Sequence, residues 1–372
     1  MKNDNEYSLK VPRRVFTRKT IKFIGRTLLN LLADVEIIHQ ERLPRTGPII
    51  LAGNHTAAME AVLMAVCNPG IVEFIGNGDI PFDPNYRLIA NTYGLIPVNR
   101  GNLDRQSLQK GLDVLKQEGI LGVFPEGGIW DPANMTPQIG IAWLSYQGDA
   151  PILPIGFGNM KNSLKKAFTL KHPKLIMHVG EKMAPVSIKD SKLSMKDNLK
   201  NAAAEILSAI NALLPESELK IANHKVDESF QLEIKVNAGQ MDIQIPAPMS
   251  VPHGSAYAHL MFNATMLDVL NRNLHLPIKP LKNIFRQTKL APALNAWQSI
   301  LDYLERNPGF FTYRFGIDEG LAVKQSLLEL VRMGTWITQC GYALSINPIR
   351  RYRNSVTNAL AVSYTHLTLP TN

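Results

Sequence analysis

The chain has 372 residues, enough for one sizeable hydrophobic core and a second, smaller unit. Its hydrophobic content is that of an ordinary globular protein, which excludes a disordered chain and a multi-spanning membrane protein. The formal net charge of +9 favours nucleic acid, anionic lipid or phosphorylated molecules as partners.

The location of the protein is predicted from its cysteines and its apolar segments. Cys67 and Cys340 are the only cysteines, which predicts a reducing compartment and no disulfide. The best candidate for a membrane-spanning helix, residues 334–349, is short and diluted by polar side chains. The first seven residues are polar and include Asp4 and Glu6, so they do not resemble a signal peptide. We therefore expect exposure to the cytoplasm.

A basic amphipathic helix is predicted within residues 1–34. Its cations have no acidic residue among them and alternate with aromatic and aliphatic side chains; they are Lys10, Arg13, Arg14, Arg18, Lys19, Lys22 and Arg26. We expect this helix to bind an anionic membrane surface, which makes the protein peripheral on the cytoplasmic face. The alternative is a solvated helix packed on the body of the protein. Nucleic-acid binding is not expected, because no stacking aromatic residues accompany a basic groove motif.

Residues 35–215 are predicted to form an α/β domain with a mostly parallel sheet flanked by helices. Short apolar runs that read as strands alternate with helical patterns. The predicted strands are 48–52, 71–75, 95–98, 120–124, 152–157 and 174–179, and the predicted helices are 103–118, 138–147 and 195–214. Residues 215–218 resemble a linker.

Residues 225–362 are predicted to be a smaller α+β region of unknown role. The pattern indicates a hairpin of strands 230–236 and 241–245, followed by helices near 256–273, 291–306 and 319–339. His253 and His259 are expected to be surface or packing residues rather than ligands. Residues 363–372 resemble translated sequencing-adapter read-through, so we set them apart and expect the true C-terminus to be missing.

Three loops that directly follow predicted strands carry the residues suited to chemistry. They are residues 54–60, with His55 and Glu60; residues 99–102, with Arg100; and residues 124–128, with Glu126. Loops after parallel strands gather at the carboxyl edge of the sheet, where ligands bind in open α/β folds. The sequence thus predicts that a base, a cation and carboxylates meet at one edge.

His55 and Glu60 form the predicted catalytic pair. Five residues apart in one regular helix they would diverge by about 140°. They can meet only if His55 precedes a helix and Glu60 lies in its first turn, with Thr56 as a suitable N-cap. A carboxylate on one imidazole nitrogen leaves the other free to accept a hydroxyl proton. These loops contain no Ser or Cys nucleophile, so we expect direct attack by the acceptor hydroxyl rather than a covalent intermediate.

Four ordered blocks resemble the glycerophospholipid acyltransferase family, which includes the lysophosphatidic-acid acyltransferases. The similarity covers roughly residues 20–215, and the blocks are Asn54-His55-x4-Glu60, residues 96–101, residues 124–127 and residues 150–155. It implies transfer of a fatty acyl group from an acyl thioester, acyl-CoA or acyl carrier protein, to a lysophospholipid hydroxyl, with 1-acyl-sn-glycerol-3-phosphate as the expected acceptor. No metal or resident cofactor is implied.

The resemblance also implies roles for single residues. His55 abstracts the acceptor proton and Glu60 orients it, while Asn54 and Gly101 lie among the substrate-binding residues. Arg100 binds the acceptor phosphate, Glu126 with Gly127 shapes the acceptor site, and Pro154 helps to form the acyl-donor pocket.

The chain departs from the family pattern in the third block. Gly128, Ile129 and Trp130 stand where the family commonly has Thr and Arg, which removes one candidate phosphate contact. Arg105, one turn into the next helix, is expected to compensate. The alternative function, from another class, is a lipid-binding or remodelling accessory protein that keeps the fold without turnover.

Overall fold

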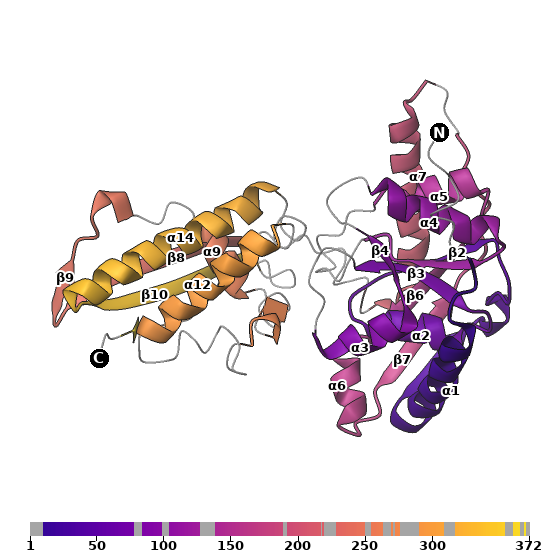
Figure 1. Ribbon diagram of the computed structural model, residues 1–372, viewed down its shortest axis with the longest axis horizontal. Helices are drawn as coiled ribbons and strands as arrows, with labels where there is room; N and C mark the ends of the chain where they lie inside the picture. The colour runs from indigo at the N-terminus through magenta and orange to yellow at the C-terminus, as the bar shows by residue number, and fades with distance from the viewer. Residues whose placement is uncertain are drawn as a thin grey trace. The chain divides into compact units, whose positions relative to one another are not determined.

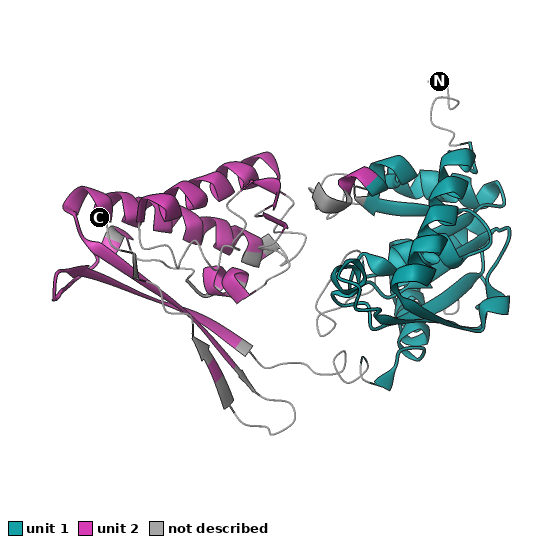
Figure 2. Ribbon diagram, turned by 90° about the horizontal axis from the view of Figure 1, so that it is seen from below, with its two compact units in different colours: residues 1–78, 89–225 teal, residues 79–88, 226–372 magenta. Residues whose placement is uncertain are grey.

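The computed structural model describes most of the chain. Its described residues are 10–77, 84–98, 104–126, 138–188, 192–216, 218, 228–249, 254–262, 269–270, 272–275, 290–308, 317–353, 360–364 and 368–369. The chain divides into two compact units, shown in Figure 2: unit 1 comprises residues 1–78 and 89–225, and unit 2 comprises residues 79–88 and 226–372.

Unit 1 is built on a seven-stranded sheet with the order β1-β7-β6-β2-β5-β3-β4. The strands are β1 (Asp34–Ile38), β2 (Ile49–Gly53), β3 (Val72–Asn77), β4 (Ile96–Val98), β5 (Ile120–Val123), β6 (Ile152–Gly158) and β7 (Lys174–Val179). Every neighbouring pair is parallel except β6 with β7. The predicted mostly parallel sheet is therefore confirmed.

Helices cover both faces of this sheet, as Figure 1 shows. They are α1 (Val15–Leu32), α2 (Met59–Cys67), α3 (Pro84–Tyr93), α4 (Arg105–Lys116), α5 (Gly140–Gly148), α6 (Ser163–Phe168) and α7 (Met195–Asn211), with a 3₁₀ turn, η2, at Gln40–Arg42. Successive residues of a strand point to opposite faces. Accordingly, Leu51 of β2 joins the core under α1 and α2, whereas Ile50 joins the core under α4, α5 and α7.

Unit 2 is an antiparallel sheet with helices packed on one face (Figure 2). Its strands are β8 (Glu228–Ala238), β9 (Met241–Ile243), β10 (Ala343–Arg353), β11 (Leu360–Tyr364) and β12 (Thr368–Leu369). Its helices are α9 (Gly254–Phe262), α12 (Leu290–Arg306) and α14 (Ile317–Cys340), with the 3₁₀ turn η4 at Ala247–Met249. The fully buried Trp297 lies in its core and donates a hydrogen bond to Tyr257 Oη at 3.0 Å.

The sequence predicted most of these elements with small shifts at their ends. The six predicted strands correspond to β2 to β7, and the hairpin corresponds to β8 and β9. β1, α3, α6, β10, β11 and β12 were not predicted. The apolar stretch 334–349 contains the end of α14 and the start of β10. Among the described helices, none combines the length and apolarity needed to cross a bilayer. β11 and β12 include residues 363–364 and 368–369 of the tail; its proposed origin stays a prediction.

Candidate active site

The loops after β2 and β5 meet at the carboxyl edge of the sheet because these two strands are parallel neighbours. His55 follows the end of β2, and Glu126 follows the end of β5. Glu126 Oε2 accepts a hydrogen bond from the backbone N–H of His55 at 2.8 Å. The carboxylate of the third loop is thus held against the base of the first.

Glu60 lies in the first turn of α2, and His55 lies just before this helix. The Glu60 side chain is fully buried, and its Oε1 accepts from the backbone N–H of Thr56 at 2.9 Å, from Thr56 Oγ1 at 2.8 Å and from the Ala57 N–H at 2.8 Å. These donors satisfy a carboxylate that would otherwise be costly to bury. They also fold the loop back on the helix, which brings residues 55 and 60 together.

The predicted N-cap role of Thr56 is wrong. α2 begins at Met59, and its N-cap residue Ala58 makes no side-chain cap hydrogen bond. Thr56 instead donates both its backbone N–H and its hydroxyl to Glu60, so the Glu side chain supplies the acceptors for the loop.

The His55 ring lies between Glu60 and an aromatic side chain. His55 Nδ1 is 3.6 Å from Glu60 Oε2, slightly beyond hydrogen-bonding distance, and no described residue hydrogen-bonds to this nitrogen. Catalytic hydrogen bonds are often longer without substrate and shorten when it binds. The ring stacks on Phe124, with centroids 4.1 Å apart and planes at 15°. The His55 side chain is 17% exposed, so a substrate hydroxyl can reach it.

Glu126 is almost completely buried, and this burial raises its pKa to about 8. The hydrogen bond from the His55 backbone lowers the pKa, and the nearby charge of Glu60 raises it further. At neutral pH the Glu126 carboxyl therefore carries a proton.

Asn54 fixes the loop to the neighbouring strand. Its Nδ2 donates to the Phe157 carbonyl at 3.0 Å, and its Oδ1 accepts from the Phe157 N–H at 2.7 Å. Both ends of the buried amide are used by the backbone of β6, so these contacts give Asn54 a structural role beside the catalytic histidine.

The other predicted site residues are placed as follows. Pro154 is buried within β6, opposite Ala52 of β2. Arg105 is exposed at the first position of α4. Arg100, Gly101 and Gly127 lie outside the described residues. Their substrate contacts stay predictions.

Phe124 is the site residue that sequence reasoning missed. It stands in the quoted block with Glu126, but no role was predicted for it. The signal that could have indicated one is its position directly after β5, next to the strand that leads into His55.

The chain is similar to known acyltransferases. A model of the family described as Acyltransferase matches residues 34–158. The 1-acyl-sn-glycerol-3-phosphate acyltransferase of Bacillus subtilis (strain 168) is 22% identical over 197 residues, covering 53% of this chain and 94% of that protein. The crystal structure of the 1-acyl-sn-glycerophosphate (LPA) acyltransferase PlsC from Thermotoga maritima is 20% identical, with a TM-score of 0.38, and covers 52% of this chain and 79% of that one. Residues 34–158 match the acyltransferase family, and the chain is distantly similar to the 1-acyl-sn-glycerol-3-phosphate acyltransferases.

Proposed function

We propose that this acyltransferase moves a fatty acyl group from an acyl thioester, on coenzyme A or acyl carrier protein, to the free hydroxyl of 1-acyl-sn-glycerol-3-phosphate or a related lysolipid at a membrane. The observation that carries the proposal is the buried Glu60 carboxylate 3.6 Å from Nδ1 of a partly exposed histidine.

The proton transfers follow from this geometry. With Nδ1 facing Glu60, Nε2 of His55 is the nitrogen left to take the proton of the acceptor hydroxyl. The hydroxyl oxygen then forms a bond to the thioester carbonyl carbon, and the carbon–sulfur bond breaks. The imidazolium returns its proton to the leaving thiolate. Glu60 stabilises the imidazolium in between, and the stack on Phe124 limits rotation of the ring.

The acceptor assignment is supported by similarity rather than by contacts. The Bacillus subtilis relative is named for 1-acyl-sn-glycerol-3-phosphate and spans about half of this chain. In this proposal the phosphate is bound by Arg100, with Arg105 on the adjoining helix as a second cation.

The test measures transfer of a radiolabelled acyl group from acyl-CoA and acyl carrier protein to lysolipids with and without a phosphate. We expect transfer to phosphate-bearing lysolipid, and we expect His55→Ala to lower its rate by about 10²–10⁴-fold, the usual contribution of a positioned base.

His39→Ala is the matched control. His39 also lies beside a carboxylate, with its Nδ1 3.3 Å from Glu41 Oε1, but both side chains are exposed and outside the site. This variant should retain the wild-type rate. Undiminished transfer by His55→Ala would remove this histidine from the mechanism. A wild-type chain that binds lysolipid without transferring an acyl group would instead support the accessory lipid-binding function.

A further inference from the structure

The aromatic ring that stacks on His55 is itself held by a second ring. Phe124 lies against Phe74 of β3, with ring centroids 6.4 Å apart and planes at 7°. The His55 ring is also nearly parallel to Phe124, at 4.1 Å and 15°. Stacked aromatic rings attract each other beyond the burial of their surface. Because Phe74 is only 4% exposed, it connects the core under α1 and α2 to the ring beside His55.

Gly122 of β5 provides the space for the Phe74 ring. The two residues are partners in the parallel pairing of β3 with β5. Phe124 lies two residues after Gly122, so side chains at these positions point to the same face of the sheet. A Cβ atom at Gly122 would lie 2.5 Å from Cε1 and 2.6 Å from Cδ1 of Phe74. Any other residue at this position would therefore displace the ring that supports Phe124.

Tyr93, at the end of α3, contacts Phe74 from another direction. Their ring centroids are 5.7 Å apart, with planes at 59°. The Tyr93 hydroxyl donates to the Val72 carbonyl at 2.7 Å, and Arg18 Cζ lies 4.6 Å from the centroid of the Tyr93 ring. Arg18 Nε also donates to the Tyr93 carbonyl at 2.9 Å. The contacts thus continue from His55 through three aromatic rings to the first turns of α1.

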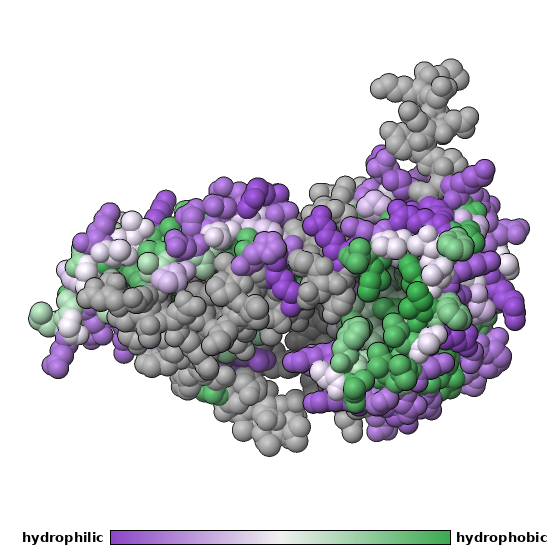
Figure 3. Space-filling model, turned by 60° about the horizontal axis from the view of Figure 1, so that its bottom comes forward, coloured by the Kyte–Doolittle hydropathy of each residue, from purple (hydrophilic) through white to green (hydrophobic). Residues whose placement is uncertain are grey.

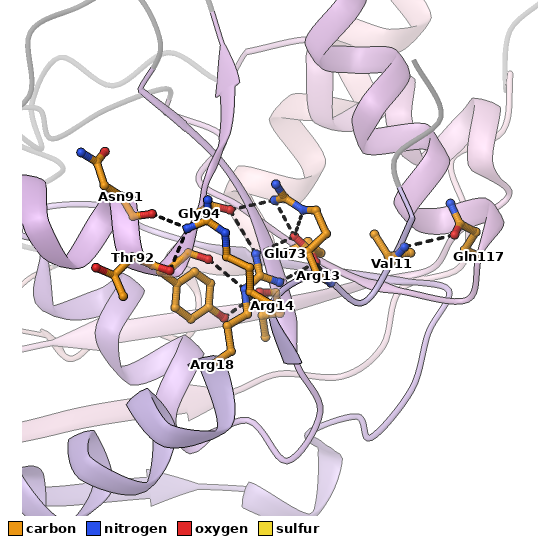
Figure 4. Close-up of polar contacts among 11 residues, drawn as sticks. Val11, Arg13, Arg14, Arg18, Glu73, Asn91, Thr92, Gly94 and Gln117 are labelled. Carbon is orange, nitrogen blue, oxygen red and sulfur yellow. Dashed lines mark hydrogen bonds and ion pairs between the residues drawn. The ribbon is translucent and has the colours of Figure 1, made fainter. Parts of the chain in front are cut away.

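Glu73 fixes the arginine at the far end of these contacts. It precedes Phe74 in β3, is 1% exposed, and accepts from Arg18 Nη1 at 2.5 Å and Nη2 at 2.9 Å. Arg13 adds its Nη2 at 2.7 Å and its backbone N–H at 2.9 Å. Figure 4 shows Arg13, Arg14 and Arg18 gathered on Glu73 and on the end of α3. Burial acts to raise the pKa of Glu73, but the hydrogen bonds and charges of Arg18 and Arg13 outweigh it and lower the pKa below its ordinary value.

The basic segment at the N-terminus is oriented by these contacts. Arg14 Nη1 donates to Thr92 O at 2.9 Å, and Lys22 Nζ donates to the carbonyls of residues 68–70. The expectation that these cations face an anionic membrane surface is wrong, because they are engaged within unit 1. Apolar residues of α1 such as Phe23 (76% exposed) point outward instead, and Figure 3 shows hydrophobic side chains gathered on a face of unit 1.

The orientation of the His55 ring depends on packing. Its Nδ1 lies 3.6 Å from Glu60 Oε2, and no described residue hydrogen-bonds to this nitrogen, so hydrogen bonds do not fix the ring. The terminal torsion of a histidine side chain has a broad minimum, which lets the ring rotate unless its neighbours restrict it. Phe124 restricts the ring on one face but is only partly buried. Phe74 is the buried neighbour that can hold Phe124 in place.

We propose that Phe74 is a positioning residue for acyl transfer, which holds Phe124 and through it keeps the His55 ring in the orientation in which Nδ1 faces Glu60. Gly122 and Tyr93 keep Phe74 in place, and the ion pairs of Arg18 with Glu73 fix Tyr93. The inference rests on the proposed function, because it assigns a role toward His55 as the base. It adds that the geometry of the base is set by residues that are buried behind it.

The test compares kcat and KM of Gly122→Ala and Phe74→Leu with those of the wild type, with acyl-CoA and 1-acyl-sn-glycerol-3-phosphate as substrates. The new methyl group of Gly122→Ala displaces the Phe74 ring, and Phe74→Leu replaces the flat ring by an aliphatic side chain. Both variants should lower kcat by about tenfold or more, since a small misplacement of a reacting group can cost about 10²-fold. KM should stay within about twofold of the wild type, because both residues are buried.

Gly148→Ala is the matched control. Gly148 is the last residue of α5, and a Cβ atom there would lie 2.9 Å from Leu115 Cδ1, so the substitution makes a similar clash in the other core of unit 1. This variant should be less stable than the wild type but keep its kcat. Combining Gly122→Ala with Phe74→Leu should restore stability, because the clash is relieved, without restoring kcat, because the ring is still missing.

Several outcomes would overturn the inference. These are a wild-type kcat in folded Gly122→Ala or Phe74→Leu, an equal loss of kcat in Gly148→Ala, and an effect on KM alone. Circular dichroism shows which variants fold, and Phe74→Leu decides the question if Gly122→Ala does not fold. His55→Ala tests the proposed function separately. Full transfer by that variant contradicts the assignment of the base, whereas a wild-type kcat in the Phe74 and Gly122 variants contradicts only their positioning role.

Discussion

Glu126 contacts the backbone of His55, and its protonation state should influence how stable the loop is at neutral pH. Its carboxyl is buried, accepts the His55 N–H at 2.8 Å and lies near the charge of Glu60. A protonated Glu126 adds no second negative charge beside His55. The site therefore combines a catalytic pair with a neutral side chain that positions the backbone of the base.

Glu126→Gln should change the pH dependence of stability. The folded-state pKa of about 8 exceeds the ordinary 4.5, so between these pH values the native state retains a proton that the unfolded state has released. The free energy of unfolding of the wild type therefore falls as pH rises through this window. Gln can still accept the His55 N–H and has no proton to lose. As pH rises through this window, the free energy of unfolding of the variant should increase relative to that of the wild type by up to ~1.4 kcal/mol per pH unit. Urea unfolding at several pH values measures this difference.

The control for this prediction is Glu181→Gln, since Glu181 is 89% exposed. The free energy of unfolding of this variant should change with pH in the same way as that of the wild type. Parallel curves for Glu126→Gln as well would contradict a raised pKa of Glu126.

At the residue scale, contacts between residues that are close along the chain are easier to predict from the sequence than contacts between residues on neighbouring strands of the sheet. The five-residue spacing of His55 and Glu60 was enough to expect Glu60 in the first turn of a helix. The stack of His55 on Phe124 and the bond from His55 to Glu126 depend on β2 and β5 being neighbours. Strand order is not encoded in local spacing, so these contacts could not be read from the sequence.

At the scale of elements, the attachment of α1 to β3 depends on one carboxylate. Arg18 is fully buried, and the Arg13 side chain is 22% exposed, so both guanidinium groups need the Glu73 charge. Removing one member of a buried ion pair leaves an uncompensated charge, which typically costs about 3–5 kcal/mol.

Glu73→Gln should lower the free energy of unfolding by about 3 kcal/mol at neutral pH. A carboxylate whose pKa is lower in the folded state stabilises the folded protein at pH values above its unfolded-state pKa. This stabilisation is lost as the pH falls through the folded-state pKa. The difference between variant and wild type should therefore shrink below the ordinary pKa of 4.5. Urea unfolding at neutral and acidic pH measures both effects.

Glu36→Gln is the matched control, because Glu36 also lies on a strand and pairs with a cation, Lys174, at 3.4 Å, but both side chains are about half exposed or more. Exposed pairs contribute about 0–1 kcal/mol. If both substitutions lower the free energy of unfolding by the same amount, the ion pairs of Glu73 with Arg13 and Arg18 do not attach α1 to β3 as their burial indicates.

The orientation of α1 illustrates what periodicity can and cannot predict. Periodicity predicted the helix and its two faces, and the structure has that helix at Val15–Leu32. Which face turns inward depends on Glu73, 55 residues from Arg18 along the chain. In the same way, apolar runs predicted β6 and β7, but their antiparallel pairing depends on the path between them.

At the scale of the whole molecule, the chain contains separate hydrophobic cores. The core of unit 2 includes only residues from 232 onward, whereas the two cores of unit 1 lie within residues 11–210. No described residue belongs to a core of both units. Domains with their own cores generally unfold as cooperative units.

Two unfolding transitions are therefore expected in calorimetry of the full-length chain. Leu115 is 1% exposed on α4 in unit 1, and Leu327 is 0% exposed on α14 in unit 2, so they form a matched pair of buried leucines on helices. Each Leu→Ala substitution should cost about 2–5 kcal/mol. Leu115→Ala should lower the midpoint of one transition and Leu327→Ala that of the other, because each cavity lies in a different core. A single transition that both substitutions shift equally would mean that the two units unfold as one.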